Sequence, residues 1–121
     1  MSEQPEYNVY YHVGKVMDLG CRVHAGTLRL TEDALEIVPN SETEGATPLT
    51  IPYRQITFPS ETFRLHFLCR MTEVVHREGS VFVTIPLISA FDRPVVSNSI
   101  QVQKLQREID RRFRSAWVKA A

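Results

Sequence analysis

The order of two hydrophobic periods along the chain constrains its fold more than any other feature. From Tyr7 to Ile88 the apolar residues recur mostly at every second position, which is the spacing of a pleated strand with one buried face. From about Ser97 to Val118 they recur at intervals of three and four, which is the spacing of an amphipathic helix. A series of short strands followed by one helix predicts a mainly β protein, built as a β-barrel or as bent antiparallel sheets, with one C-terminal α-helix.

Alternation and turn-forming residues place the individual strands. The clearest pair is a hairpin of 27–30 and 34–38, with Leu28 and Leu30 facing inward and polar residues at the turn. We expect an irregular segment at 86–96 and a solvated loop at 39–48, where no apolar period is found and turn formers accumulate. The strands are expected at 7–17, 27–30, 34–38, 49–51, 56–58, 63–71, 73–77 and 80–85.

The last segment has the pattern of a helix with one apolar stripe. The stripe consists of Val102, Leu105, Ile109, Phe113, Ala116 and Trp117. Ser97, Asn98 or Ser99 can supply the oxygen that caps the first turn. Glu108 with Arg112 and Asp110 with Arg114 form pairs four residues apart, in the order that stabilises a helix. We expect the stripe to cover one end of the sheet, with Trp117 packed over the open end.

Length and charge favour one neutral domain. A chain of 121 residues fits a single domain, which we place at 7–118 after a disordered tail at 1–6. The formal net charge is zero, which argues against nucleic-acid binding because that binding needs a net basic surface. Residues 1–62 nevertheless carry nine acidic and four basic side chains, whereas 63–121 carry five acidic and ten basic ones. We interpret this asymmetry as charges that mix on the folded surface.

Several features favour the cytoplasm. The N-terminus is acidic and lacks the apolar segment of a secretion signal. The most apolar stretch, from Val81 to Phe91, is far shorter than the roughly 18 residues that a membrane span requires. The two cysteines, Cys21 and Cys69, fit a reducing compartment. We expect a cytoplasmic protein that is either free or peripheral at a membrane.

The sequence contains no recognisable motif for catalysis or for cofactor binding. No motif surrounds either cysteine, as a nucleophile with a histidine partner would require. Cys21-x-x-His24 is half of a zinc pattern, but no second pair at ligand spacing follows it. The five glycines are dispersed and form no phosphate-binding loop. We expect no catalytic residue, no metal and no cofactor.

Basic side chains form three groups that could hold an anion, because arginine presents a planar fork of donors. The first group lies in or beside the first loops and consists of Lys15, Arg22, His24 and Arg29. The second is predicted to share the outward face of the strand 63–71 and consists of Arg64, His66 and Arg70. The third lines the exposed side of the helix and consists of Lys104, Arg107, Arg111 and Arg114, which we interpret as a solvated face.

Four segments together resemble the pleckstrin-homology-like (PH-like) superfamily, and GRAM and bacterial PH-like domains in particular. They are GTLRLTEDALEIVP (26–39), PLTIPYRQI (48–56), SVFVTIP (80–86) and QKLQREIDRRF (103–113). The resemblance spans roughly residues 7–117. It implies a PH-like roll, in which a seven-stranded, strongly bent antiparallel sheet forms a half-open barrel and the last helix plugs one end.

The same resemblance implies a binding function without catalytic residues. Such domains dock on phosphoinositides, other lipids, peptides or protein surfaces. Phosphoinositide-binding members of the superfamily carry a series of lysine and arginine residues across the first two strands. Lys15 and Arg22 resemble the start of that series, but His24 stands where an arginine is expected. We therefore expect a non-catalytic module for protein interaction or self-association, for instance by strand addition at a free sheet edge. The alternative is an anionic lipid headgroup at Lys15, Arg22, His24 and Arg29; a small enzyme or carrier, or nucleic acid on the Arg64 and Arg70 face, is less favoured.

Overall fold

The computed structural model describes residues 5–14, 23–40, 47–64, 69–90 and 93–120, and for 58–64, 69–70, 90, 93–95 and 119–120 it is the backbone that is described. These ranges hold nine strands, one short 3₁₀ helix (η1) and one α-helix. The elements are β1 (Glu6–Val13), β2 (His24–Leu30), β3 (Ala34–Pro39), β4 (Leu49–Pro52), η1 (Tyr53–Gln55), β5 (Ile56–Arg64), β6 (Cys69–His76), β7 (Gly79–Thr84), β8 (Pro86–Ala90), β9 (Arg93–Ser97) and α1 (Ser99–Ala120).

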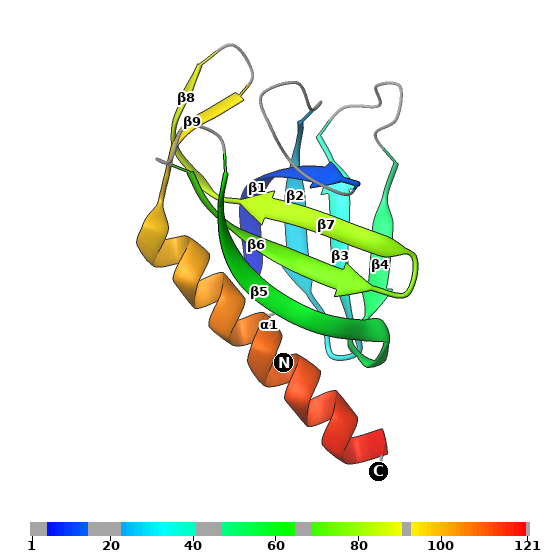
Figure 1. Ribbon diagram of the computed structural model, residues 1–121. Coiled ribbons are helices and arrows are strands. Elements are labelled where there is room, and N and C mark those ends of the chain that lie inside the picture. Colours follow the sequence, from blue (N-terminus) through cyan, green and yellow to red (C-terminus); the bar gives the residue numbers. More distant parts are fainter. Residues whose placement is uncertain (1–4, 15–22, 41–46, 65–68, 91–92, 121) are drawn as a thin grey trace.

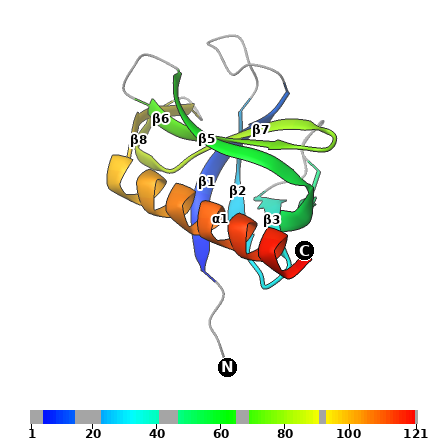
Figure 2. The ribbon, with the colours of Figure 1, turned by 60° about the horizontal axis from the view of Figure 1, so that its bottom comes forward.

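Seven of the strands form one curled antiparallel sheet. Its strand order is β4-β3-β2-β1-β7-β6-β5, so that β1 is the central strand and joins β2, β3 and β4 to β7, β6 and β5. The sheet bends into a half-barrel, and α1 lies across one end of it (Figures 1 and 2). The predicted fold class is therefore confirmed: the molecule is mainly β with one C-terminal helix, and its architecture is consistent with a PH-like roll.

The inside of the curled sheet is filled with side chains. Period-two residues of β1, β2, β3 and β7 turn inward, and α1 adds a stripe that is closed to solvent. Tyr11 is 1% exposed, and Leu28, Leu105 and Ile109 are fully buried. The remaining core members are Val9, Leu30, Leu35, Ile37, Ile51, Tyr53, Ile56, Val74, Val81, Val83, Ile85 and Val102.

The predicted hairpin of β2 and β3 is confirmed, and its turn is fixed by a threonine. The Thr31 hydroxyl donates to the Ala34 carbonyl at 2.9 Å and accepts from the Ala34 amide at 3.1 Å. Glu32 and Asp33 at the tip are exposed. Gly26 in β2 is required by packing, because a Cβ there would lie 2.7 Å from the Val38 carbonyl oxygen.

Asn98 caps the predicted helix. Its side-chain oxygen accepts from the Gln101 amide at 3.3 Å, and its carbonyl accepts from the Val102 amide at 2.9 Å. Both predicted ion pairs form at 2.9 Å, between Glu108 and Arg112 and between Asp110 and Arg114. The helix therefore begins and is stabilised where the sequence indicates.

The predicted strand 63–71 is wrong, because two strands occupy this part of the chain. β5 continues from Ile56 through Pro59 to Arg64, and β6 begins at Cys69. Their register pairs Phe63 with Arg70 and Arg64 with Cys69. Proline is tolerated within β5 because this strand lies at the edge of the sheet, where half of the amides have no partner.

The prediction of an irregular segment at 86–96 is also wrong. β8 and β9 pair there as a separate two-stranded sheet with two register irregularities. β9 packs beside β6, and the Asn98 amide donates to the Ile85 carbonyl at 2.8 Å, which ties the end of this hairpin to the main sheet. Pro86 stands at the first position of β8, where a strand needs no donor.

Three further expectations need correction. β1 begins at Glu6, inside the predicted tail, because the Leu30 amide donates to the Pro5 carbonyl at 3.0 Å and extends the pairing with β2. Val13 at the other end of β1, which the alternation predicts on the same face as Val9 and Tyr11, is 50% exposed, whereas those two residues are buried. Trp117 does not pack over the open end of the sheet, because it is 53% exposed on the last turns of α1.

Candidate functional site

The first predicted basic group is only partly within the described residues, and those members are not brought together. His24 and Arg29 stand near opposite ends of β2, about 17 Å apart along the strand. The half-buried His24 ring lies 5.6 Å from the Tyr11 ring. Arg29 is exposed on the other face of the strand and binds Glu6 at 2.8 Å. Lys15 and Arg22 lie outside the described residues.

The second predicted basic group does not share one strand. Arg64 ends β5 and Arg70 belongs to β6, and their partners in the ladder are Cys69 and Phe63. The prediction that one strand carries this group is therefore wrong, and His66 lies outside the described residues.

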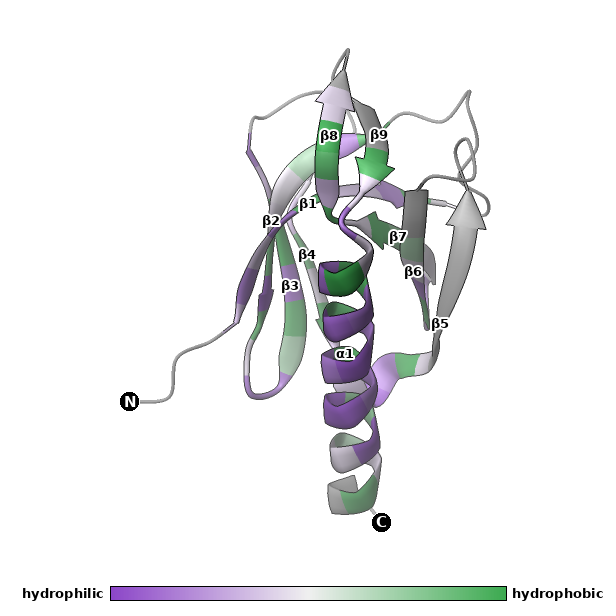
Figure 3. Cartoon of the chain, turned by 90° about the vertical axis from the view of Figure 1, so that its left-hand side faces the viewer, coloured by the Kyte–Doolittle hydropathy of each residue, from purple (hydrophilic) through white to green (hydrophobic). Residues whose placement is uncertain are grey.

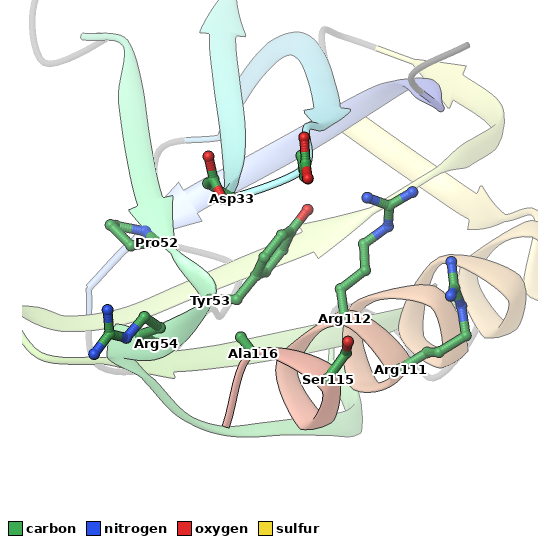
Figure 4. A pocket seen from close by; sticks show the side chains of 9 residues that line it. Asp33, Pro52, Tyr53, Arg54, Arg111, Arg112, Ser115 and Ala116 are labelled. Carbon is green, nitrogen blue, oxygen red and sulfur yellow. The ribbon is translucent and has the colours of Figure 1, made fainter. Parts of the chain in front are cut away.

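A groove lies between the C-terminal half of α1, the β2–β3 turn and η1. Its volume is about 530 Å³, which falls in the range of ligand pockets. Tyr53 lies in the middle of the groove with Ala116 on the helix side, and Arg54 and Arg111 lie on opposite sides of Tyr53 (Figure 4). The lining residues are Glu32, Asp33, Pro52, Tyr53, Arg54, Arg111, Arg112, Ser115 and Ala116.

One backbone carbonyl joins the walls of this groove, because it accepts hydrogen bonds from two side chains. The Tyr53 hydroxyl donates to the Thr31 carbonyl at 2.8 Å. The Arg112 guanidinium donates to the same carbonyl at 2.9 Å through Nη1 and to Glu108 at 2.9 Å through Nε. These bonds join the helix, η1 and the β2–β3 turn, so that the three walls are held at fixed positions relative to one another.

Tyr53 and Glu108, two ionisable groups around the groove, each keep one ionisation state near neutral pH. Hydrogen bonds from Arg111, followed by those from Arg112, lower the pKa of Glu108 below its usual range, although burial opposes this shift. Burial raises the pKa of Tyr53 to about 12, against a smaller opposing effect from Arg112. Tyr53 therefore stays a neutral hydrogen-bond donor and Glu108 stays a carboxylate.

The groove offers three kinds of surface to a ligand. Glu32 and Asp33 form an acidic rim on the β2–β3 turn, whereas the exposed Arg54 and Arg111 supply positive charge on the other walls. Between them lies an apolar floor, in which Pro52 and Ala116 are half-buried and Tyr53 is only 1% exposed. The arrangement can bind an apolar group whose neighbours carry charges of both signs.

Sequence reasoning missed this groove, although one signal pointed toward it. Glu108 and Arg112 are predicted as an ion pair within the helix, but Arg112 also reaches a turn 81 residues away in sequence. Its side chain is 21% exposed, compared with 67% for Arg111. Two consecutive arginines at the edge of an apolar stripe are the pattern that could have indicated a partner beyond the helix.

No protein-family model and no curated protein match the chain. The resemblance to the PH-like superfamily therefore stays a prediction, although the fold is of the kind that the resemblance implies. The described residues contain no group of three or more His, Cys, Asp or Glu placed to hold a metal ion. In the same ranges, no helix combines the length and the apolar character that crossing a membrane requires.

Proposed function

We propose that the chain is a non-catalytic binding module of the PH/GRAM-like type, which binds a segment of a partner protein in the groove beside α1. The observation that carries the proposal is the contrast between a filled barrel interior and an outer groove with an apolar floor. Tyr11, Leu28 and Ile109 illustrate the filling, since none is more than 1% exposed. Such packing favours recognition on the outside of the molecule.

A protein segment suits the groove better than a simple anion. The charged side chains that line it are two carboxylates and three arginines, and one of those arginines already binds Glu108 and the Thr31 carbonyl. An anion would meet the carboxylates of Glu32 and Asp33 at the rim. A peptide can instead place a basic side chain at that rim and an apolar one against Ala116, since mixed polar and apolar contacts are usual at protein interfaces.

Strand addition at a sheet edge is the less favoured route to a protein partner. The Tyr53 amide donates to the Asp33 carbonyl at 3.2 Å, which continues the pairing of β4 with β3. Because ladder bonds alternate between the two sides of a strand, the outward amide positions of β4 are those of Thr50 and Pro52. Proline has no N–H, and β5 at the other edge contains Pro59, so both edges are poor templates for an added strand.

The chemistry of the groove supports a role without catalysis. A general acid or base works best with a pKa near the operating pH. The pKa shifts of the groups around the groove go the other way, since that of Tyr53 rises to about 12 and that of Glu108 falls. These groups are suited to fixed hydrogen bonding and charge pairing.

An anionic lipid headgroup bound by Lys15, Arg22, His24 and Arg29 is the second candidate function. Of its two described members, His24 contacts Tyr11 and Arg29 is already paired with Glu6, so neither supports this candidate over the groove. For a module of this kind we propose a cytoplasmic location, either free or peripheral at a membrane.

The groove can be tested by selecting binding peptides and then filling it. Peptides enriched from a random display library on the wild-type protein should contain an apolar residue next to a basic one. Ser115→Trp fills the groove from an exposed position of α1, and it should weaken the binding of these peptides by at least about tenfold, roughly the effect of losing one good contact.

The matched control is Thr50→Trp, which places the same side chain at an exposed position outside the groove. Peptide affinity of this variant, measured by fluorescence anisotropy, should equal that of the wild type. A library that yields no binder, or peptides that bind the Ser115→Trp protein as well as the wild type, would show that the groove is not the binding site.

A further inference from the structure

The outer side of α1 carries a continuous line of exposed residues, which we call the helix face. Its members are Ile100, Lys104, Arg107, Arg111, Arg114 and Val118. They follow one another at steps of four and three, so they lie on one side of the helix along a length of about 27 Å. Ile100 is 66% exposed and Val118 is 75% exposed, which are high values for large aliphatic side chains.

The helix face is apolar at both ends and basic in the middle. Figure 3 looks onto this side of the molecule and shows hydrophobic turns at the two ends of α1 with a hydrophilic stretch between them. β8 and β9 lie on the same side, beyond the first turn of the helix (Figure 3). Leu87 and Ile88 of β8 are also exposed, with exposed fractions of 64% and 54%.

Positive charge is concentrated on this one element. α1 carries six basic and two acidic residues, a net charge of +4, while the rest of the neutral chain carries −4. Lys104 and Arg107 form no ion pair within the described part of the chain. Arg111 and Arg114 bind Glu108 and Asp110 but remain 67% and 75% exposed. The four cations are therefore accessible to a partner.

We propose that the helix face docks flat on an anionic lipid bilayer, with its basic middle on the headgroups and its apolar ends in the boundary between headgroups and acyl chains. A surface helix with aliphatic and basic residues on one side is suited to this interface, because apolar burial and attraction to anionic lipids act together. The groove and its protein ligand are not involved, apart from Arg111 at their common border.

Two other anionic partners fit the helix face less well. Protein interfaces are apolar at the centre and polar at the rim, whereas the helix face has charges at the centre and aliphatic side chains at the ends. Nucleic acid would leave Ile100 and Val118 against a charged backbone without a favourable contact, and its affinity rests on a net basic protein. A fluid bilayer accommodates both the charges and the aliphatic ends.

Vesicle sedimentation tests the proposal directly. The wild-type protein should bind phosphatidylcholine vesicles that contain about one-third phosphatidylserine and should not bind pure phosphatidylcholine. Lys104→Gln with Arg107→Gln should reduce partitioning about 25-fold, since each basic residue near an anionic surface contributes about fivefold. Ile100→Gln with Val118→Gln should reduce it severalfold even at low salt, because these residues contribute apolar burial.

The matched control is Arg77→Gln, which removes one charge from an exposed position outside the helix face, the groove and the first basic group, and it is compared with Lys104→Gln alone. Its partitioning should stay within about twofold of the wild type. Three results would overturn the proposal: no binding to the phosphatidylserine vesicles, an equal loss in the control, or binding of the wild type to polyglutamate or duplex DNA but not to vesicles.

Discussion

The two halves of α1 follow the same apolar pattern but have different roles. In the first half, Val102, Leu105 and Ile109 are fully buried against the curled sheet. In the second half, Phe113 and Ala116 are only partly buried and Trp117 is 53% exposed. Trp117 instead packs edge to face on Phe113, with ring centroids 6.2 Å apart. One stripe on one helix thus serves the core at one end and an open surface at the other.

The difference between the halves comes from what lies opposite them. The helix contacts β5, β6 and η1. Beyond η1 the C-terminal half borders the groove instead of a packed strand, and the Arg112 bond to Thr31 holds it there. The apolar period of a helix therefore indicates which side can be buried, while the extent of the sheet decides how much of that side is buried.

Truncating one large side chain in each half of α1 is the most direct test of the difference between the two halves. Leu105→Ala should lower the free energy of unfolding by about 2–5 kcal/mol, because it leaves a cavity in the core. Phe113→Ala should cost only about 1–2 kcal/mol, because part of its ring is in water already. Urea denaturation followed by circular dichroism measures both values, and equal losses would contradict the division of α1 into two functional halves.

A second measurement tests the attachment of the C-terminal half. Arg112→Met removes the bonds to Thr31 and Glu108 and should cost about 1–3 kcal/mol of unfolding free energy. Arg111→Met is the matched control, since Arg111 shares Glu108 but is 67% exposed, and its loss should cost much less stability than the loss of Arg112. If both variants are equally stable, the Arg112 bond to the β2–β3 turn does not hold the helix.

The Tyr53 hydroxyl, which donates to the same Thr31 carbonyl, can be tested through the pH dependence of stability. Its pKa rises to about 12 from 10.0, so its contribution to stability is complete below about pH 10 and is lost as the pH rises toward 12. Tyr53→Phe should cost about 1 kcal/mol at pH 7 and should remove this part of the alkaline loss. Because burial also raises the pKa values of Tyr7 and Tyr11, some alkaline loss should persist. An unchanged alkaline unfolding profile would contradict the assignment.

The smallest effect is expected at the end of the helix. Trp117→Ala should change the free energy of unfolding by no more than about 0.5 kcal/mol, as for most exposed positions. Thermal unfolding is a sufficient measurement. A loss comparable to that of Leu105→Ala would mean that the C-terminal half is core after all.

Local patterns account for the parts of the fold that the sequence predicts well. The β2–β3 hairpin depends on alternation over a few residues, and the helix depends on Asn98 and a stripe that repeats every three or four residues. Both signals lie within one element. The class of the fold follows from their order along the chain.

The failures have two physical causes. Alternation continues from Phe63 to Met71 without a glycine, proline, asparagine or aspartate, so nothing in that segment indicates the end of β5 and the start of β6. Two prolines are misleading for a second reason: Pro59 lies within an edge strand and Pro86 begins β8, and neither position needs an amide donor.

The groove is invisible to pattern analysis because its walls come from three separate segments of the chain. Residues 32–33, 52–54 and 111–116 meet through hydrogen bonds that converge on the Thr31 carbonyl. No short-range period encodes that meeting. The exposed basic residues of the helix, in contrast, can be placed on one side from helical spacing alone.

Proline at both margins of the curled sheet has a consequence for behaviour at high concentration. Pro52 and Pro59 interrupt the row of donors that another copy of the chain would need to extend the sheet. Growth into cross-β fibrils therefore finds no intact starting template at the two described margins of the seven-stranded sheet.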